Sequence, residues 1–126
     1  MTLAQISDPH VRIGPGDLGS AEALAAAVRA VAELDPAPDA LLLSGDLTND
    51  GDDAEYRRVA ELLAPLSVPV HVLAGNHDDP DGLRAHIGAP GQPGEPVRYA
   101  LRVGELRLVA CDTTVAGHEE GAFGAE

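Results

Sequence analysis

Residues 40–51 read Ala-Leu-Leu-Leu-Ser-Gly-Asp-Leu-Thr-Asn-Asp-Gly, an apolar run that leads directly into a glycine and an acidic residue. The run from Ala40 to Leu43 does not alternate between apolar and polar residues, which is typical of a strand buried on both faces of a parallel sheet. Asp46 stands just beyond the carboxyl end of this predicted strand, where parallel α/β sheets usually carry their functional groups. The stretch therefore predicts both a fold class and the place of a site.

The same arrangement occurs on both sides of this stretch. The apolar residues 3–6 lead into Asp8-Pro9-His10, and residues 68–73 lead into Gly75-Asn76-His77-Asp78. Because the carboxyl ends of parallel strands meet at one edge of a sheet, we expect these three strings to converge there.

Helical patterns follow each predicted strand. Ser20 is the expected N-cap of the first helix, in which Leu24, Val28 and Val31 have the i, i+4, i+7 spacing of one apolar face. The second helix is expected from Asp53 to Ala64, and the third from an Asp79-Pro80 start to about Gly88. Three strand–helix units in series predict a parallel sheet with right-handed crossovers.

The pattern changes after residue 96. Val97, Tyr99, Leu101 and Val103 would point to one side and the arginines at 98 and 102 to the other, which predicts a half-exposed strand. Gly104-Glu105 is a two-residue turn signal, and residues 106–111 would return as the antiparallel partner. We therefore expect one α/β domain over residues 1–126, with a mostly parallel sheet and a C-terminal β-hairpin.

Composition narrows the function classes. The chain has 126 residues, 21 acids against 8 arginines, no lysine and a formal net charge of −13. This balance argues against a nucleic-acid partner, because phosphate backbones are bound through basic surfaces. Cys111 is the single cysteine, so an intrachain disulfide or a thiolate metal cluster is excluded. No stretch approaches the roughly 18 apolar residues of a membrane span, and we expect a cytoplasmic protein without a membrane partner.

The side chains of the three strings suit metal chemistry. Asp8, His10 and Asp46 offer carboxylate and imidazole ligands of the kind that bind Mn, Fe, Zn or Co, and Asp46 could bridge two ions with its two oxygens. Asn76 offers a carbonyl oxygen to a second ion, while His77 would face the reacting group as an acid or charge stabiliser. With two ions about 3.5–4 Å apart, a bridging hydroxide could attack phosphorus in line.

Each string alone is a weak signal. Asp-x-His occurs by chance, Gly-Asp often marks a turn, and Asn-His-Asp could form an ordinary loop with an Asx turn. Their common order, each directly after a predicted strand, favours the functional interpretation.

The chain resembles the calcineurin-like metallophosphoesterases, whose pattern runs Asp-x-His, Gly-Asp, Gly-Asn-His-Asp/Glu, then a later histidine and Gly-His-x-His. The segments that resemble the bacterial class III 3',5'-cyclic nucleotide phosphodiesterases most are Ser7-Asp8-Pro9-His10, Gly45-Asp46-Leu47-Thr48, Gly75-Asn76-His77-Asp78-Asp79 and Asp112-Thr113-Thr114-Val115-Ala116-Gly117-His118. The resemblance implies a four-layer αββα sandwich and a hydrolase that acts on a small phosphate diester, such as a cyclic nucleotide.

By the same resemblance, two divalent ions would be held by Asp8, His10, Asp46 and Asn76. His77 would meet the scissile phosphate and its leaving oxygen as the catalytic residue. His118 is a further candidate for substrate contact, because the matching loop of the cyclic nucleotide branch approaches the substrate.

Two departures from the family pattern stand out. Asn49 replaces a frequent aspartate to which no metal role attaches. The later histidine and Gly-His-x-His do not occur, so we expect the N-terminal half of the domain.

An alternative is a truncated metal-binding module with weak or no activity that associates, for instance as a homodimer, through its open sheet edge. Leu47, Thr48 and Asn49 disfavour the tyrosinate site of purple acid phosphatases, and the acidic balance disfavours a nuclease.

Overall fold

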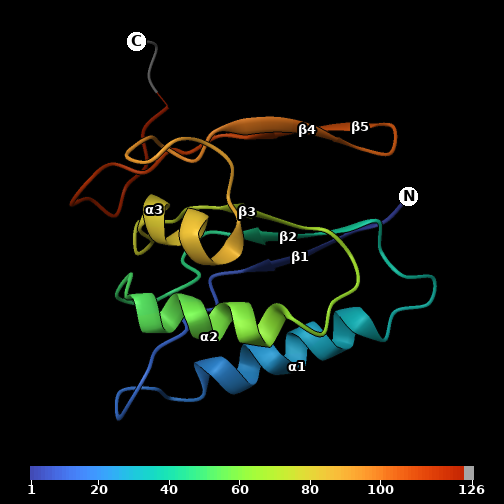
Figure 1. The fold of residues 1–126 in the computed structure, drawn as a ribbon, viewed down its shortest axis with the longest axis horizontal. Coiled ribbons are helices and arrows are strands. Elements are labelled where there is room, and N and C mark those ends of the chain that lie inside the picture. Colours follow the sequence, from blue (N-terminus) through green and yellow to red (C-terminus); the bar gives the residue numbers. More distant parts are fainter. Residues whose placement is uncertain (124–126) are drawn as a thin grey trace.

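A computed structural model describes residues 1–123 of the chain. Figure 1 shows a layer of helices below a parallel sheet, with a β-hairpin above it. In chain order the elements are β1 (Leu3–Ser7), α1 (Ser20–Ala32), β2 (Ala40–Ser44), α2 (Asp53–Leu63), β3 (Val70–Leu73), α3 (Pro80–Gly82), the wide turn η1 (Leu83–Ile87), β4 (Tyr99–Val103) and β5 (Leu106–Ala110). This confirms the predicted α/β class, with a parallel sheet and a C-terminal hairpin.

The parallel sheet has the order β1-β2-β3, so the strand of residues 40–44 lies in its centre. Its central place explains its apolar sequence: Ala40, Leu41 and Leu43 are completely buried. Pairing also continues past the ends of β1 and β2, where Asp8 N donates to Gly45 O at 3.1 Å and His10 N to Asp46 O at 2.9 Å. The first two predicted strings are therefore joined by backbone hydrogen bonds.

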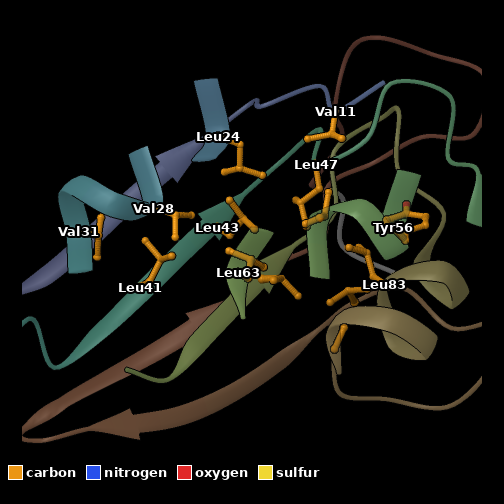
Figure 2. Close-up of a cluster of buried hydrophobic side chains, with 14 residues drawn as sticks. Val11, Leu24, Val28, Val31, Leu41, Leu43, Leu47, Tyr56, Leu63 and Leu83 are labelled. Atoms are coloured by element: carbon orange, nitrogen blue, oxygen red, sulfur yellow. The ribbon is translucent and has the colours of Figure 1, made fainter. Parts of the chain in front are cut away.

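The main core fills the space between α1, α2 and the sheet. Figure 2 shows Leu24, Val28 and Val31 of α1 turned toward Leu41 and Leu43 of β2. The apolar face that the spacing predicts is thus the buried face of α1. Near the carboxyl ends of the strands the same core continues through a second group of fully buried side chains, which comprises Val11, Leu47, Tyr56 and Leu83. The loops that carry the predicted site therefore rest on packed side chains.

The hairpin β4–β5 lies on the side of the sheet away from α1 and α2 (Figure 1). Its two strands are antiparallel and joined at Gly104-Glu105, as predicted, with Val103 opposite Leu106. Tyr99 in β4 donates a hydrogen bond from its hydroxyl to Val72 O in β3 at 2.7 Å, which links the hairpin to the sheet. Helices, sheet and hairpin are consistent with the N-terminal half of the sandwich that the resemblance implies.

The start of α1 differs from the prediction. Gly19 takes the N-cap position with φ 96°, and Ser20 is the first helical residue. Asp17 instead supplies the capping oxygen: its Oδ1 accepts from Gly19 N at 3.0 Å, Ser20 N at 2.8 Å and the Ser20 hydroxyl at 2.7 Å. The prediction that Ser20 is the N-cap is therefore wrong: Ser20 is already helical, and the Asp17 carboxylate accepts from both its N–H and its hydroxyl.

The third helix begins as predicted but is short. Asp79 caps it by accepting from Gly82 N at 2.8 Å, with Pro80 in the first turn. The chain then widens into η1, where Gly88 N donates to Leu83 O at 3.0 Å.

Among residues 1–123, no helix combines the length and the apolar character needed to cross a membrane.

Candidate metal and phosphate site

Donor atoms from three loops meet at the carboxyl edge of the parallel sheet. His10, Asp46 and His77 each offer one ligand atom, and these atoms all lie within 4.8 Å of one another. His10 Nε2 lies 3.5 Å from Asp46 Oδ2, and the rings of His10 and His77 meet edge to face with centroids 4.9 Å apart. The three strings that the sequence predicts to converge therefore do so.

The spacing of these atoms fits a metal ion. Two ligands about 2.1 Å from one tetrahedral ion stand about 3.4 Å apart. The 3.5 Å between His10 Nε2 and Asp46 Oδ2 matches that separation and is long for a hydrogen bond. Imidazole nitrogen and carboxylate oxygen together suit divalent transition metals.

Asp8 and Asn76 reach the same place from neighbouring loops. They line a cavity of about 180 Å³ together with Asp46, under the turn that contains Glu119 and Glu120. Asp8 and Asn76 are exposed, whereas Asp46 is only 9% exposed. The structure thus places the four predicted metal ligands around one region, with His77 beside them.

The backbone at this edge is unusual. Among residues 1–123, the non-glycine residues with positive φ are Asp8 at 51°, His10 at 44° and Asp46 at 44°. Such conformations cost about 1–3 kcal/mol each and persist only where surrounding contacts impose them, most often at functional sites. Here the imposing contacts are the hydrogen bonds that pair Asp8 with Gly45 and His10 with Asp46. All three strained residues are predicted metal ligands.

Gly75 leaves room for Asp46. A Cβ atom at position 75 would overlap the backbone N and the Oδ1 of Asp46, far inside van der Waals contact. Asp46 Oδ1 accepts a hydrogen bond from His77 N at 3.0 Å, which holds the carboxylate against this loop. Position 75, in the third string, must therefore be a glycine so that Asp46, in the second string, can occupy its place.

His77 is oriented by a backbone carbonyl. Its Nδ1 lies 2.6 Å from Asn49 O, and since a carbonyl only accepts, Nδ1 carries the proton of this hydrogen bond. Nε2 is then the nitrogen available for a metal, a phosphate oxygen or a proton. Sequence reasoning missed this role of Asn49, because a main-chain contact leaves no trace in residue type.

Asp78 joins the second and third strings. Its Oδ2 accepts from Leu47 N at 3.1 Å and Gly75 N at 2.9 Å, and its Oδ1 accepts from Thr48 N at 3.1 Å and from the Thr48 hydroxyl at 3.2 Å. The Tyr56 hydroxyl donates to the same Oδ1 at 3.3 Å. Burial raises the pKa of the Asp78 carboxyl, although the N–H groups of Gly75, Leu47 and Thr48 act in the opposite direction. Asp78 is thus a structural clamp, a function that its place in the motif does not reveal.

Tyr56 completes this support from α2. Asp79 N donates to its hydroxyl at 2.6 Å, and burial raises the pKa of Tyr56. The hydroxyl therefore stays protonated and keeps its hydrogen bonds at any ordinary pH.

Asp112 anchors the last loop. It is buried and accepts from Val97 N at 2.9 Å, Thr114 N at 2.9 Å and the Thr114 hydroxyl at 2.6 Å. A second cavity, of about 290 Å³, lies between this loop and Asn76.

His118 is exposed, with Nδ1 3.1 Å from Glu120 Oε1, and lies outside the linings of both cavities. The structure does not bring His118 to the site, and its substrate contact stays a prediction.

Comparison with known proteins agrees with this geometry. Residues 1–120 match the family model described as calcineurin-like phosphoesterase. The chain is 35% identical over 117 residues to a probable cyclic nucleotide phosphodiesterase of Synechococcus, covering 90% of this chain and 44% of that protein. It is 34% identical to a glycerophosphodiester phosphodiesterase of Enterobacter lignolyticus (96% of this chain, 46% of that protein) and 32% identical to a 3',5'-cyclic adenosine monophosphate phosphodiesterase of Pseudomonas aeruginosa (94% and 44%).

The chain spans less than half the length of each of these relatives. The match nevertheless includes all three strings and the strands that carry them. The chain belongs to the calcineurin-like phosphoesterase family.

Proposed function

We propose that this chain binds divalent metal ions and hydrolyses a small phosphate diester, with a 3',5'-cyclic nucleotide as the candidate substrate. The observation that carries the proposal is the convergence of His10, Asp46 and His77, whose donor atoms lie within 4.8 Å of one another. Relatives named as cyclic nucleotide and glycerophosphodiester phosphodiesterases support a diester over a monoester.

Asp8, His10, Asp46 and Asn76 would hold the metal ions. Bound there, such ions would polarise a phosphoryl oxygen and lower the pKa of a water molecule. Two contacts hold the Asp46 side chain in place: His77 N donates to one of its oxygens, and Gly75 packs against it.

His77 is the proposed acid. With Nδ1 committed to Asn49 O, its imidazolium form carries the second proton on Nε2, the nitrogen left free to pass that proton to the leaving alkoxide. General acid catalysis of this kind contributes about 10²–10⁴-fold.

The test is hydrolysis of bis(p-nitrophenyl) phosphate and of cyclic AMP by the metal-stripped chain and by the Mn²⁺-loaded chain. We expect turnover only with Mn²⁺, loss of both turnover and Mn²⁺ affinity in Asp46→Ala, and loss of turnover with retained Mn²⁺ affinity in His77→Ala. Glu33→Ala is the matched control, because it removes a carboxylate from an exposed position after α1. Full activity in both site variants would refute the assigned roles.

The same measurements distinguish the alternative, a metal-binding module without turnover. That alternative is favoured by the single group of three donors within residues 1–123. One tightly bound Mn²⁺, no hydrolysis of either substrate and concentration-dependent association in analytical ultracentrifugation would support it. An active monomer would exclude it.

A further inference from the structure

The cavity of about 290 Å³ beside Asn76 adjoins the cavity of the predicted metal ligands. We call it the loop cavity, because its lining residues lie in the segments 75–80, 94–96 and 112–116. Gly75, Asn76 and Thr114 line both cavities. Each cavity alone is smaller than the roughly 300–1,000 Å³ of small-molecule sites, whereas the two joined fall within that range.

This adjacency gives the loop cavity a place in the proposed reaction. A phosphate held by metal ions at Asp46 and Asn76 would have the loop cavity beside it, since Asn76 borders both spaces. The alcohol part of a phosphate ester would therefore extend into the loop cavity.

The wall that contains Glu95 is fixed before any ligand arrives. Gly94 N donates to Asp81 Oδ1 at 3.0 Å, and Arg84 donates to Glu95 O at 2.6 Å and to Pro96 O at 3.2 Å. Arg84 also donates to Asp81 Oδ1 at 2.7 Å, and its side chain is only 10% exposed. The backbone on both sides of Glu95 is thus held against α3 and η1.

The opposite wall, after β5, is fixed by Asp112. This buried carboxylate accepts from Val97 N and from both the N–H and the hydroxyl of Thr114. Since the Thr114 hydroxyl gives its hydrogen to Asp112, it faces a ligand as an acceptor. Both walls lie at the end of the hairpin nearest α3 (Figure 1).

The polar side chains of the loop cavity leave acceptors free. The oxygens of Asp78 and Asp112 already accept hydrogen bonds from the chain. Glu95 is exposed: its Oε2 accepts from Gln92 N at 3.3 Å, and its other oxygen accepts no hydrogen bond within residues 1–123. Among the described residues that line the cavity there is no arginine, lysine or histidine. A ligand in the cavity must therefore bring donors, and a second anionic group finds no counter-charge.

The rest of the wall is apolar and consists of Pro80, Pro96, Val115 and Ala116, together with glycines. A small polyol such as glycerol would leave this apolar surface in contact with water, whereas a flat heterocycle would cover it. A heterocycle with an amino group also supplies the N–H donors that Glu95 and the Thr114 hydroxyl can accept. The combination of an apolar wall and free acceptors favours an aminated ring.

We propose that the loop cavity is a nucleobase subsite, in which the Glu95 carboxylate accepts a hydrogen bond from the exocyclic amino group of the base. The inference rests on the proposed function for the identity of the ester, but the subsite itself needs neither metal nor turnover. It favours a cyclic nucleotide with an aminated base over a glycerol diester. Glu95 is thus a specificity residue.

The test is an NMR titration of the 126-residue chain without metal, observed at the backbone amides of Gly94, Glu95, Thr114 and Val115. The probes are adenosine, purine riboside, which lacks only the amino group of adenosine, ribose, and ethanolamine as a small ammonium compound. We expect both nucleosides to shift these amides, with a Kd about three- to tenfold lower for adenosine, which is the gain of one hydrogen bond. Ribose should leave the amides unshifted.

Variants make the assignment specific. Glu95→Ala should raise the Kd of adenosine to that of purine riboside, and Glu95→Gln, which keeps an acceptor oxygen without the charge, should retain part of the preference. Glu105→Ala is the matched control, because it removes an exposed carboxylate at the hairpin turn, outside the lining of the cavity. Ala116→Phe would fill the cavity from an exposed position and should weaken the binding of both nucleosides.

Three results would overturn the subsite. These are equal Kd values for adenosine and purine riboside, an unchanged preference for adenosine in Glu95→Ala, and tighter binding of ethanolamine than of adenosine at the same amides. The last result would assign the cavity to an ammonium group instead.

The outcome is independent of the proposed hydrolysis. If the chain binds adenosine through Glu95 but hydrolyses no diester, the subsite stands and the proposed function fails. If it hydrolyses diesters while Glu95→Ala binds both nucleosides like the wild type, the subsite fails and the proposed function stands.

Discussion

The hydrogen bonds that Asp78 accepts can be tested by replacing a single atom of its side chain. Asp78→Asn keeps the size of the side chain but replaces one acceptor oxygen with an NH₂ group. In one orientation this group faces Leu47 N and Gly75 N, and in the other it faces Thr48 N, the Thr48 hydroxyl and the Tyr56 hydroxyl. The first orientation leaves two backbone donors without an acceptor. The second leaves only Thr48 N, because a hydroxyl can accept from the NH₂ group and the Tyr56 hydroxyl can donate to Asp79 O instead.

The magnitude follows from the count of lost bonds. The amide favours the orientation that leaves only Thr48 N without an acceptor, and a buried donor without a partner costs about 1–3 kcal/mol. Part of this loss is offset, because a neutral asparagine avoids the cost of burying a charged carboxylate. The same cost raises the pKa of Asp78. We expect a net loss of about 1–2 kcal/mol, a sizeable share of the 5–15 kcal/mol that stabilises a typical domain.

Urea denaturation followed by far-UV circular dichroism measures this loss as a change in the free energy of unfolding. Asp79→Asn is the matched control, because its side chain accepts one hydrogen bond, from Gly82 N, and asparagine is an equally good N-cap. The control should change the free energy of unfolding by less than about 0.5 kcal/mol. If Asp78→Asn is as stable as Asp79→Asn, the clamp does not hold the two strings together.

Further predictions concern the site, the hairpin and the start of α1. Gly75→Ala should displace Asp46 and lower Mn²⁺ affinity, measured by calorimetry, and should cost about 1–3 kcal/mol in urea denaturation; unchanged affinity would contradict the packing argument. Tyr99→Phe removes the hydrogen bond to Val72 and should lower the free energy of unfolding by about 1 kcal/mol, with faster amide exchange in β4; equal exchange would show that the contact is dispensable. Ser20 holds the pKa of the Asp17 carboxyl below its usual value, so Asp17 stabilises the fold above the unfolded pKa of about 4 and this contribution is lost as pH falls below it. Asp17→Asn should therefore weaken the fall in stability on acidification in melts from pH 6 to 3, and an identical pH profile would refute this linkage.

The strands and the hairpin were predictable because their signals are local. The buried run before Asp46, the alternation from Val97 to Val103 and the turn at Gly104 each lie within a few residues. The cap of α1 was predicted wrongly for the same reason: Ser20 and Asp17 both suit a cap, and the path of the chain decides which side chain reaches the free N–H groups.

The sequence by itself determined the kinds of atoms available to the site and the order in which the strands deliver them. Carboxylate, imidazole and amide groups after three apolar runs suffice to predict convergence, because parallel strands end at a common edge. Only the tertiary structure decided how these atoms are held. The positive φ of Asp8, His10 and Asp46 and the orientation of His77 by Asn49 O arise from contacts through space. Such contacts join residues up to about thirty positions apart, and no local pattern along the chain records them.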